Sequence, residues 1–127
     1  MIAAGIGFNS AVSGEDIAAL VRDAAAQAGL ALAELSVLAT LERRIAEAPF
    51  AAAAGALALP VAAVASADLA GVSGRVKTHS ARVLARFGVG SVAEAAALCA
   101  AGPDARLILP RIARARVTCA LAEGAGR

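Results

Sequence analysis

The sequence predicts an α/β fold, a three-layer α/β/α sandwich with a mixed, mostly parallel sheet of about five strands. Two observations support this fold class. Short apolar stretches alternate along the 127-residue chain with longer stretches that show the apolar periodicity of helices. The last two apolar stretches are joined by a short connection, so they can pair as an antiparallel hairpin and make the sheet mixed. We expect residues 1–127 to form one domain with helices on both faces of the sheet.

Strands and helices alternate through the first half of the chain. Strands are expected over 1–7, 35–41 and 61–65, and helices over 14–28 and 49–57. Ser13 is a good N-cap for the first helix, and Asp16 can close a capping box with it. Gly29 ends that helix. Pro49 stands at the first-turn position that proline favours, so it opens the second helix.

The second half of the chain begins with a turn and a loop. Ser66 can cap a short turn, and the glycines and serine of 71–77 predict a loop after it. Helices are expected over 80–87 and 91–101, and closing strands over 107–109 and 117–122. Between these helices, Gly88 can take the left-handed conformation that ends a helix. Ser91 and Glu94 then form a capping box for the next helix.

The formal net charge of +2 is distributed unevenly along the chain. Residues 1–70 contain three basic and seven acidic residues, a net charge of −4. Residues 71–127 contain nine basic and three acidic residues, a net charge of +6. Arg111, Arg114 and Arg116 lie between the last two strands and would form a basic loop. The second half therefore favours an anionic partner, with an uneven but solvated surface as the alternative.

A candidate site follows from the expected direction of the strands. In a sheet with parallel strands, ligands bind beyond the carboxyl ends of those strands. Those ends carry the segment 7–10, the charged segment 42–44 and Ser66, and the turn at 90–91 can close over the same place. The helix after that turn points backbone N–H groups at the loop, which suits an anion. We therefore expect these scattered segments to form one pocket.

Four segments in a fixed order resemble one protein family. They are Gly5-Ile6-Gly7 before a capped helix, ATLERRIAEAP at 39–49, GVGSVAEAAAL at 88–98, and LILPR at 107–111 followed by VTCALA at 117–122. Together they resemble the CobE/CbiG C-terminal family of cobalamin biosynthesis over nearly the whole chain. The resemblance implies a three-layer α/β/α domain that acts in corrin ring synthesis. It also implies a methylated precorrin as ligand, a large tetrapyrrole-derived macrocycle edged with acetate and propionate groups.

The resemblance and the sheet edge together indicate which residues would contact such a ligand. The candidate ligand-binding residues are Gly5, Gly7, Asn9, Ser10, Thr40, Arg44, Glu47, His79, Ser80, Gly90, Ser91 and Arg111. Arg44, His79 and Arg111 would meet its carboxylates, since charged donors form strong hydrogen bonds with them. The helix N-terminus at Ser91 would add partial positive charge. An internal ion pair with Glu47 is the alternative role for Arg44.

The implied function is to bind or hand over a precorrin-type corrin-ring intermediate. One alternative is a hydrolase that opens the ring-A lactone of such an intermediate, although the longer relatives linked to that activity contain further domains. Another is a structural subunit that docks onto another corrin-pathway enzyme through its alanine-rich face. His79 has no carboxylate nearby in sequence to orient it, which favours ligand contact over catalysis. The catalytic residues of a hydrolase stay unassigned, and whether the chain is an enzyme stays open.

Other ligand classes fit the sequence poorly. Gly5 and Gly7 begin a dinucleotide-binding pattern, but the third glycine position of that pattern is Ser10. Cys99, Cys119 and the one histidine have no metal-ligand spacing, so no metal and no other cofactor is expected. The chain has no tryptophan or tyrosine, so its arginines lack the stacking partners typical of nucleic-acid binding. We therefore expect no nucleic-acid partner.

The sequence also carries expectations about location and association. No basic segment precedes the first apolar residues, and the uncharged interval 48–67 is divided by Pro49, Gly55 and Pro60. A secretory signal needs such a basic segment, and a membrane span needs about 20 strongly apolar residues. We expect a cytoplasmic protein with no membrane partner and with both cysteines buried as reduced thiols. Alanine buries little area, so a homodimer is a further expectation.

Overall fold

The computed structural model describes residues 1–9 and 11–126 of the chain. Its strands are β1 (Ile2–Phe8), β2 (Val37–Leu41), β3 (Val61–Val64), β4 (Arg106–Arg114) and β5 (Val117–Glu123). Its α-helices are α1 (Gly14–Gln27), α2 (Ala48–Leu57), α3 (Ser66–Leu69), α4 (Ala81–Phe87) and α5 (Val92–Ala101). Short 3₁₀ helices are η1 (Leu32–Glu34), η2 (Glu42–Arg44) and η3 (Ala70–Arg75). η3 occupies part of the loop expected over 71–77; the other elements follow the predicted alternation.

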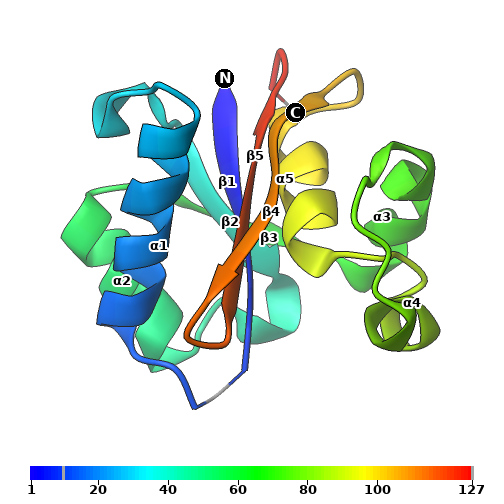
Figure 1. The fold of residues 1–127 in the computed structure, drawn as a ribbon, viewed down its shortest axis with the longest axis horizontal. Coiled ribbons are helices and arrows are strands. Elements are labelled where there is room, and N and C mark those ends of the chain that lie inside the picture. The colour runs from blue at the N-terminus through cyan, green and yellow to red at the C-terminus, as the bar shows by residue number, and fades with distance from the viewer. Residues whose placement is uncertain (10, 127) are drawn as a thin grey trace.

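A five-stranded sheet forms the middle of three layers. Figure 1 shows α1 and α2 on one face of this sheet, and α5 with α3 and α4 outside it on the other. The strand order is β3-β2-β1-β5-β4; β1, β2 and β3 are parallel, and β5 is antiparallel to both of its neighbours. Four strands therefore share one direction. The mixed, mostly parallel α/β/α sandwich that the sequence predicts is confirmed.

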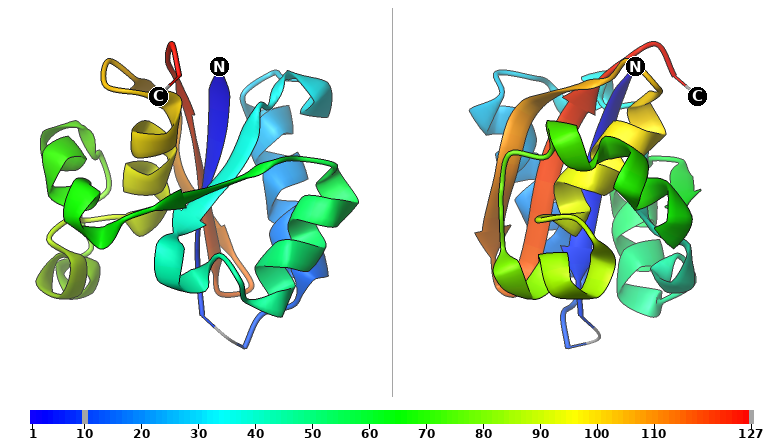
Figure 2. Two further views of the ribbon diagram at one scale, coloured as in Figure 1. Left: turned by 180° about the vertical axis from the view of Figure 1, so that it is seen from behind. Right: turned by 90° about the vertical axis from the view of Figure 1, so that its right-hand side faces the viewer.

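The parallel strands end at the same side of the sheet, which we call its carboxyl edge. Gly5 pairs with Ala39, and Leu41 pairs with Val64, so β1, β2 and β3 run side by side toward this edge. Both chain ends lie at the opposite edge, as the two views of Figure 2 show. The segments that follow β1 and β2 therefore start next to each other, as the sequence analysis expected.

The connection between β4 and β5 is shorter than the sequence predicts. The strand before the turn extends to Arg114, and only Ala115 and Arg116 form the turn, with φ of 54° and 68°. Positive φ at both central residues is typical of the type I′ turn, which matches the twist of antiparallel strands. Pro110 is tolerated inside β4 because β4 lies at the sheet edge. The expected basic loop is therefore wrong, since Arg111 belongs to a strand.

Small residues let α5 lie very close to the central strand β1. A Cβ atom at Gly5 would lie 2.0 Å from the Ala93 carbonyl oxygen and 2.5 Å from the Ala97 backbone nitrogen. Most of α5 is alanine, and most of it is buried. The opposite face of the sheet is filled by larger side chains, among them the fully buried Phe50 and Ile17. Helix α5 is thus part of the hydrophobic core.

The predicted helix caps are confirmed in full at α1, in part at α5, and not at α3. Ser13 and Asp16 form the expected capping box, in which Ser13 Oγ accepts a hydrogen bond from the Asp16 N–H at 3.1 Å. Ser91 Oγ accepts from the Glu94 N–H at 3.2 Å. The Glu94 carboxylate bonds to other segments, so the capping box expected at α5 is wrong. Ser66 is the first residue of α3 rather than its cap.

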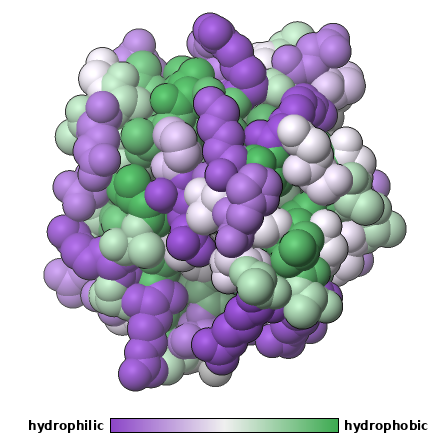
Figure 3. All heavy atoms as spheres, turned by 45° about the vertical axis from the view of Figure 1, so that its right-hand side comes forward, coloured by the Kyte–Doolittle hydropathy of each residue, from purple (hydrophilic) through white to green (hydrophobic). Residues whose placement is uncertain are grey.

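Hydrophilic residues are spread over the surface between small hydrophobic patches on the face that Figure 3 shows. Among the described residues, no single helix combines the length and the apolar composition of a membrane span. Helices α4 and α5 meet those criteria only as a pair with a 55° bend between them. Most of α5 is buried in the core, which explains its apolar composition.

Candidate functional site

A cavity of about 210 Å³ lies at the sheet edge where β1 and β2 end. Helix α4 and the first residue of α5 form its opposite wall. The described residues that line it are Gly7, Phe8, Asn9, Thr40, Leu41, Arg44, Val83, Arg86, Phe87 and Val92. Its position agrees with the rule that ligands bind beyond the carboxyl ends of parallel strands.

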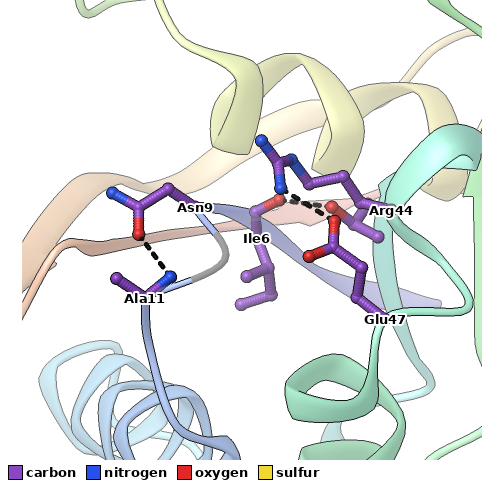
Figure 4. Close-up of polar contacts among 6 residues, drawn as sticks. Ile6, Asn9, Ala11, Arg44 and Glu47 are labelled. Atoms are coloured by element: carbon purple, nitrogen blue, oxygen red, sulfur yellow. Dashed lines mark hydrogen bonds and ion pairs between the residues drawn. The ribbon is translucent and has the colours of Figure 1, made fainter.

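The wall formed by β1 consists of Gly7 and Phe8, followed directly by Asn9 with its amide side chain. A Cβ atom at Gly7 would lie 2.5 Å from Thr118 Oγ1, so a larger residue would require the Thr118 side chain to move. Asn9 follows, and its Oδ1 accepts a hydrogen bond from the Ala11 N–H at 2.9 Å (Figure 4). The Asn9 side-chain NH₂ is a group with which this wall can donate a hydrogen bond to a ligand.

Thr40 ties the ends of the two central strands together at the cavity. Its Oγ1 donates a hydrogen bond to the Ile6 carbonyl oxygen at 2.9 Å, and the residue is almost completely buried. Because its proton is already engaged, the hydroxyl can only accept a hydrogen bond from a ligand. Thr40 therefore fixes the spacing of β1 and β2 where the cavity begins.

Arg44 follows β2 in η2 and reaches the cavity with its guanidinium group. Its Nη1 donates to Glu47 Oε2 at 2.7 Å, as Figure 4 shows. Its guanidinium carbon lies 5.4 Å from the centre of the Phe8 ring, within the range of a cation–π contact. The ion pair that the sequence offered as an alternative is thus present. Arg44 still lines the cavity, and its remaining N–H groups can bind a carboxylate.

Helix α4 supplies three lining residues that the sequence analysis did not select, Val83, Arg86 and Phe87. The guanidinium carbons of Arg86 and Arg43 lie 5.1 Å and 5.3 Å from the centre of the Phe87 ring. Directly after Phe87, Gly88 has a φ of 76° and ends the helix as predicted. The available signal was position, because Arg86 and Phe87 immediately precede the turn assigned to the pocket.

Glu94 is a further important residue that the sequence analysis interpreted only as a cap. The side chain is fully buried. Its Oε1 accepts hydrogen bonds from the N–H groups of Lys77 and Thr78 at 2.7 Å and 2.9 Å. Its Oε2 accepts from the Thr78 hydroxyl at 2.6 Å and from the Arg111 N–H at 2.8 Å. The carboxylate thus holds residues 77–78, in the segment before α4, and the edge strand β4 against α5.

Two opposing effects set the pKa of the Glu94 carboxyl. Burial raises this pKa, since it disfavours the charged form. The hydrogen bonds lower it, first the one from the Arg111 N–H and then those from Thr78 and Lys77. The hydrogen bonds prevail, so the pKa of Glu94 lies below its usual value. Glu94 is therefore an ionised, structural carboxylate near the start of both helices that line the cavity.

The structure brings only some of the predicted site residues together. Gly7, Asn9, Thr40 and Arg44 line the cavity, and Glu47 adjoins it through its ion pair with Arg44. Ser10 lies outside the residues that the structure describes. The remaining predicted residues are Gly5, His79, Ser80, Gly90, Ser91 and Arg111, and none of them lines the cavity. The expectation of one pocket that contains all these residues needs correction.

Packing explains where several of these residues lie instead. Gly5 is buried beneath α5, where its missing side chain allows the close approach of that helix. A Cβ atom at Gly90 would lie 2.2 Å from the Thr78 carbonyl oxygen, so the segment before α4 lies directly on this turn. Ser80 Oγ accepts from the Val83 N–H at 3.4 Å and caps α4. These residues shape the helices around the cavity rather than its surface.

Three residues that were predicted to meet the carboxylates of the ligand also lie away from the cavity. Ser91 is buried, and its hydroxyl is used as the cap of α5. His79 is exposed in the segment before α4. Arg111 is held in β4, where its backbone N–H donates to Glu94. The cationic side of the cavity therefore consists of Arg44 and Arg86.

The cysteines lie in the predicted elements, Cys99 in α5 and Cys119 in β5. Cys119 is fully buried, and burial raises the pKa of its thiol to about 12. Cys99 is only partly buried, in contrast to the expectation, and its Sγ lies 3.5 Å from the Asp68 carbonyl oxygen. Within residues 1–9 and 11–126, no three His, Cys, Asp or Glu side chains gather so that they could hold a metal ion.

The fold and this site define a small three-layer α/β domain with an arginine- and phenylalanine-lined cavity at its carboxyl edge. The model of the family described as "Cobalamin synthesis G C-terminus" matches residues 2–122. The chain belongs to this family, and it is a cobalamin biosynthesis protein. The resemblance found in the sequence motifs is confirmed.

Individual relatives agree with this assignment. The chain is similar to the curated protein CobE of Sinorhizobium sp., with 38% identity over 118 residues, which cover 93% of this chain and 77% of the relative. It also resembles the crystal structure of CobE, a protein from the cobalamin (vitamin B12) biosynthetic pathway, with a TM-score of 0.89 and 34% identity, over 100% of this chain and 92% of that one.

Two further solved structures share the fold. Cobalamin biosynthesis protein chiG of Agrobacterium tumefaciens matches with a TM-score of 0.77 and 38% identity, over 98% of this chain and 99% of that one. A putative cobalamin biosynthesis protein G homolog of Sulfolobus solfataricus matches with a TM-score of 0.71 and 22% identity. The match covers 96% of this chain but 36% of that one, and at this identity it indicates the fold alone.

Proposed function

We propose that the cavity binds one edge of a precorrin-type corrin intermediate, and that the protein holds this intermediate or hands it to another enzyme of the pathway. The observation that carries the proposal is the pairing of Arg44 and Arg86 with Phe8 and Phe87 in one cavity. Guanidinium groups recognise carboxylates, and aromatic rings pack against a flat apolar macrocycle. A corrin intermediate presents both features, because its ring is edged with acetate and propionate groups.

The size of the cavity limits how such a ligand would bind. Pockets that enclose a drug-sized ligand have volumes of roughly 300–1,000 Å³. The cavity here has about 210 Å³, so it would admit an acidic side arm and the adjoining ring edge. The rest of the macrocycle would lie outside, over the rim formed by η2 and α4. Incomplete enclosure suits a protein that must release its ligand to the next enzyme.

Binding is better supported than lactone hydrolysis. Hydrolysis needs a general base or nucleophile within hydrogen-bonding reach of the reacting group. The described residues that line the cavity include no histidine, cysteine, aspartate or glutamate. Arg44 and Arg86 are permanently charged and suited to holding a carboxylate, not to taking up a proton. Docking through an alanine-rich face has less support at α5, because that helix is buried in the core.

The proposal is tested by titrating the protein with cobyrinic acid, a corrin polycarboxylic acid, and following the visible absorption of the ring. Loss of one charge-assisted contact corresponds to about a tenfold or greater loss of affinity, so Arg44→Gln should raise Kd by this factor. Higher ionic strength should also weaken binding, since the contact is electrostatic. Arg114→Gln is the control, because Arg114 does not line the cavity and pairs with Asp23 of α1.

The fully esterified, neutral form of the same corrin separates charge recognition from ring stacking. It should bind much more weakly than the acid to the unmodified protein. Equal binding of acid and ester, or equal affinity of Arg44→Gln and the unmodified protein, would contradict the proposal. Far-ultraviolet circular dichroism of each variant shows that a loss of binding does not arise from unfolding.

A further inference from the structure

Two arginines at the rim of the cavity share one aromatic ring. The guanidinium carbon of Arg43 lies 5.3 Å from the centre of the Phe87 ring, and that of Arg86 lies 5.1 Å from it. The two cationic carbons therefore lie within about 10 Å of each other. Arg43 comes from η2, directly after β2, whereas Arg86 and Phe87 come from α4. The cluster thus joins two elements across the mouth of the cavity.

The ion pairs between described residues involve other arginines. The ion pairs within residues 1–9 and 11–126 are Arg44 with Glu47, Arg106 with Glu123, and Arg114 with Asp23. Neither Arg43 nor Arg86 takes part in one. Glu47, which adjoins the cavity, is engaged by Arg44. Two like charges held near each other repel, and a bound anion between them would remove that repulsion.

Helix α4 is only weakly attached to the rest of the molecule. It has seven residues, and none of them is buried. Leu84 on this helix is 50% exposed. Its ends are set by the Ser80 cap and by the left-handed Gly88, and its inward contacts are those of Val83, Arg86 and Phe87 at the cavity. A ligand that bridges Arg86 and Arg43 would therefore add a substantial share of the contacts that hold α4 in place.

We propose that Arg43 and Arg86, which both contact the Phe87 ring, form a second carboxylate subsite that binds a second acidic arm of the ligand and fixes α4 over the cavity. This inference rests on the proposed function, since Arg44 inside the cavity would hold the first arm. A carboxylate has two oxygens, so it can accept hydrogen bonds from both guanidinium groups at once. The Arg43–Arg86 subsite selects ligands with neighbouring acidic arms over ligands with a single carboxylate.

The subsite is tested with Arg43→Gln, Arg86→Gln and the double variant, by titration with cobyrinic acid. Each single variant should raise Kd by about tenfold. The double variant should lose less affinity than the product of the two single losses, because both arginines hold the same carboxylate. Arg82→Gln is the matched control, since Arg82 is an exposed arginine on the same helix and has no contact with Phe87. Its Kd should stay within twofold of the original.

The closure of α4 has its own readout. The chain contains no tryptophan or tyrosine, so Leu84→Trp introduces a single indole on the exposed side of α4. Saturation with cobyrinic acid should quench this indole, because the absorbing corrin ring is held beside the helix. With Arg43→Gln and Arg86→Gln added, saturating ligand should quench it clearly less. Equal quenching with and without the two arginines would overturn the closure of α4.

The outcomes separate this inference from the proposed function. If Arg44→Gln weakens binding while Arg43→Gln and Arg86→Gln leave Kd unchanged, the subsite is wrong and the proposed function stands. Independent, fully multiplicative losses from the two arginines would likewise overturn a shared carboxylate. If the unmodified protein does not bind cobyrinic acid, both proposals are wrong.

Discussion

Replacement of Glu94 by glutamine changes one atom of a fully buried side chain and tests what holds the cavity walls together. The carboxylate accepts four hydrogen bonds, two at each oxygen. An amide NH₂ at the Oε2 position can donate to the Thr78 hydroxyl if that hydroxyl rotates, but it faces the Arg111 N–H with another donor. At the Oε1 position it would face the N–H groups of both Lys77 and Thr78. Glutamine therefore leaves at least one buried N–H without an acceptor.

The magnitude follows from these contacts. An unsatisfied buried donor costs about 1–3 kcal/mol, and each surviving bond to a neutral rather than a charged acceptor loses about 1 kcal/mol. The free energy of unfolding of Glu94→Gln should therefore be lower by about 3–5 kcal/mol. For a domain of this size, about 1 kcal/mol corresponds to roughly 4 °C, so the expected fall in Tm is about 12–20 °C.

Thermal and urea unfolding followed by far-ultraviolet circular dichroism measure the loss, since the chain has no tryptophan or tyrosine for fluorescence. Glu15→Gln is the control, because Glu15 is an exposed carboxylate at the first turn of α1. Its removal should cost at most about 1 kcal/mol. If Glu94→Gln unfolded at nearly the same temperature as the original, the assignment of Glu94 as the tie between the three segments would be wrong.

The pH dependence of this loss has a defined sign. The pKa of Glu94 in the folded protein is lowered from 4.5, so its contribution to stability is fully present above that value. The contribution disappears as pH falls through the lowered pKa and the carboxyl takes up a proton. The stability difference between the original protein and Glu94→Gln should therefore be constant at neutral pH and shrink under acidic conditions. A gap that widened toward acidic pH would refute the reasoning.

Two further predictions concern the core. Gly5→Ala should lower the free energy of unfolding by about 3 kcal/mol or more, because the new Cβ would lie 2.0 Å from the Ala93 carbonyl oxygen. Gly55→Ala in α2 meets open space and should instead raise it by about 0.5–1 kcal/mol, and urea unfolding of both variants checks the contrast. Burial raises the pKa of Cys119 to about 12, so this thiol should resist iodoacetamide at mildly alkaline pH in the folded protein and react in urea. Mass spectrometry of the labelled peptides tests this, and rapid labelling of Cys119 without urea would contradict its place in the core.

The sequence predicted well those features that depend on neighbouring residues. Ser13 with Asp16, Gly29 after α1 and Gly88 after α4 act through bonds or backbone angles within one turn, and each has the expected role. The order of strands and helices follows from apolar periodicity in the same local way. The direction of the strands predicted a pocket beyond the carboxyl ends of β1 and β2, and the structure has a cavity there.

The errors arose where a residue's role depends on distant segments. Glu94 has a suitable position for a capping box, but partners from 77–78 and from Arg111 offer its carboxylate four donors, which outweigh one bond to its own helix. The expected strand 107–109 ends directly before Pro110, whereas β4 continues through this proline, which lacks an N–H, to Arg114. Its position in the edge strand removes that penalty, which only the sheet order reveals.

The glycine-containing turn at 88–91 has a different relation to the site from the one its sequence suggested. Gly88 ends α4, Gly90 accommodates the backbone of Thr78, and the buried Ser91 caps α5. Each of these roles fixes a helix, and the cavity is lined by the residues just outside the turn, Phe87 on one side and Val92 on the other. The turn is therefore a joint that sets the angle between two helices. We therefore expect ligand contact from the side chains beside this turn rather than from the turn itself.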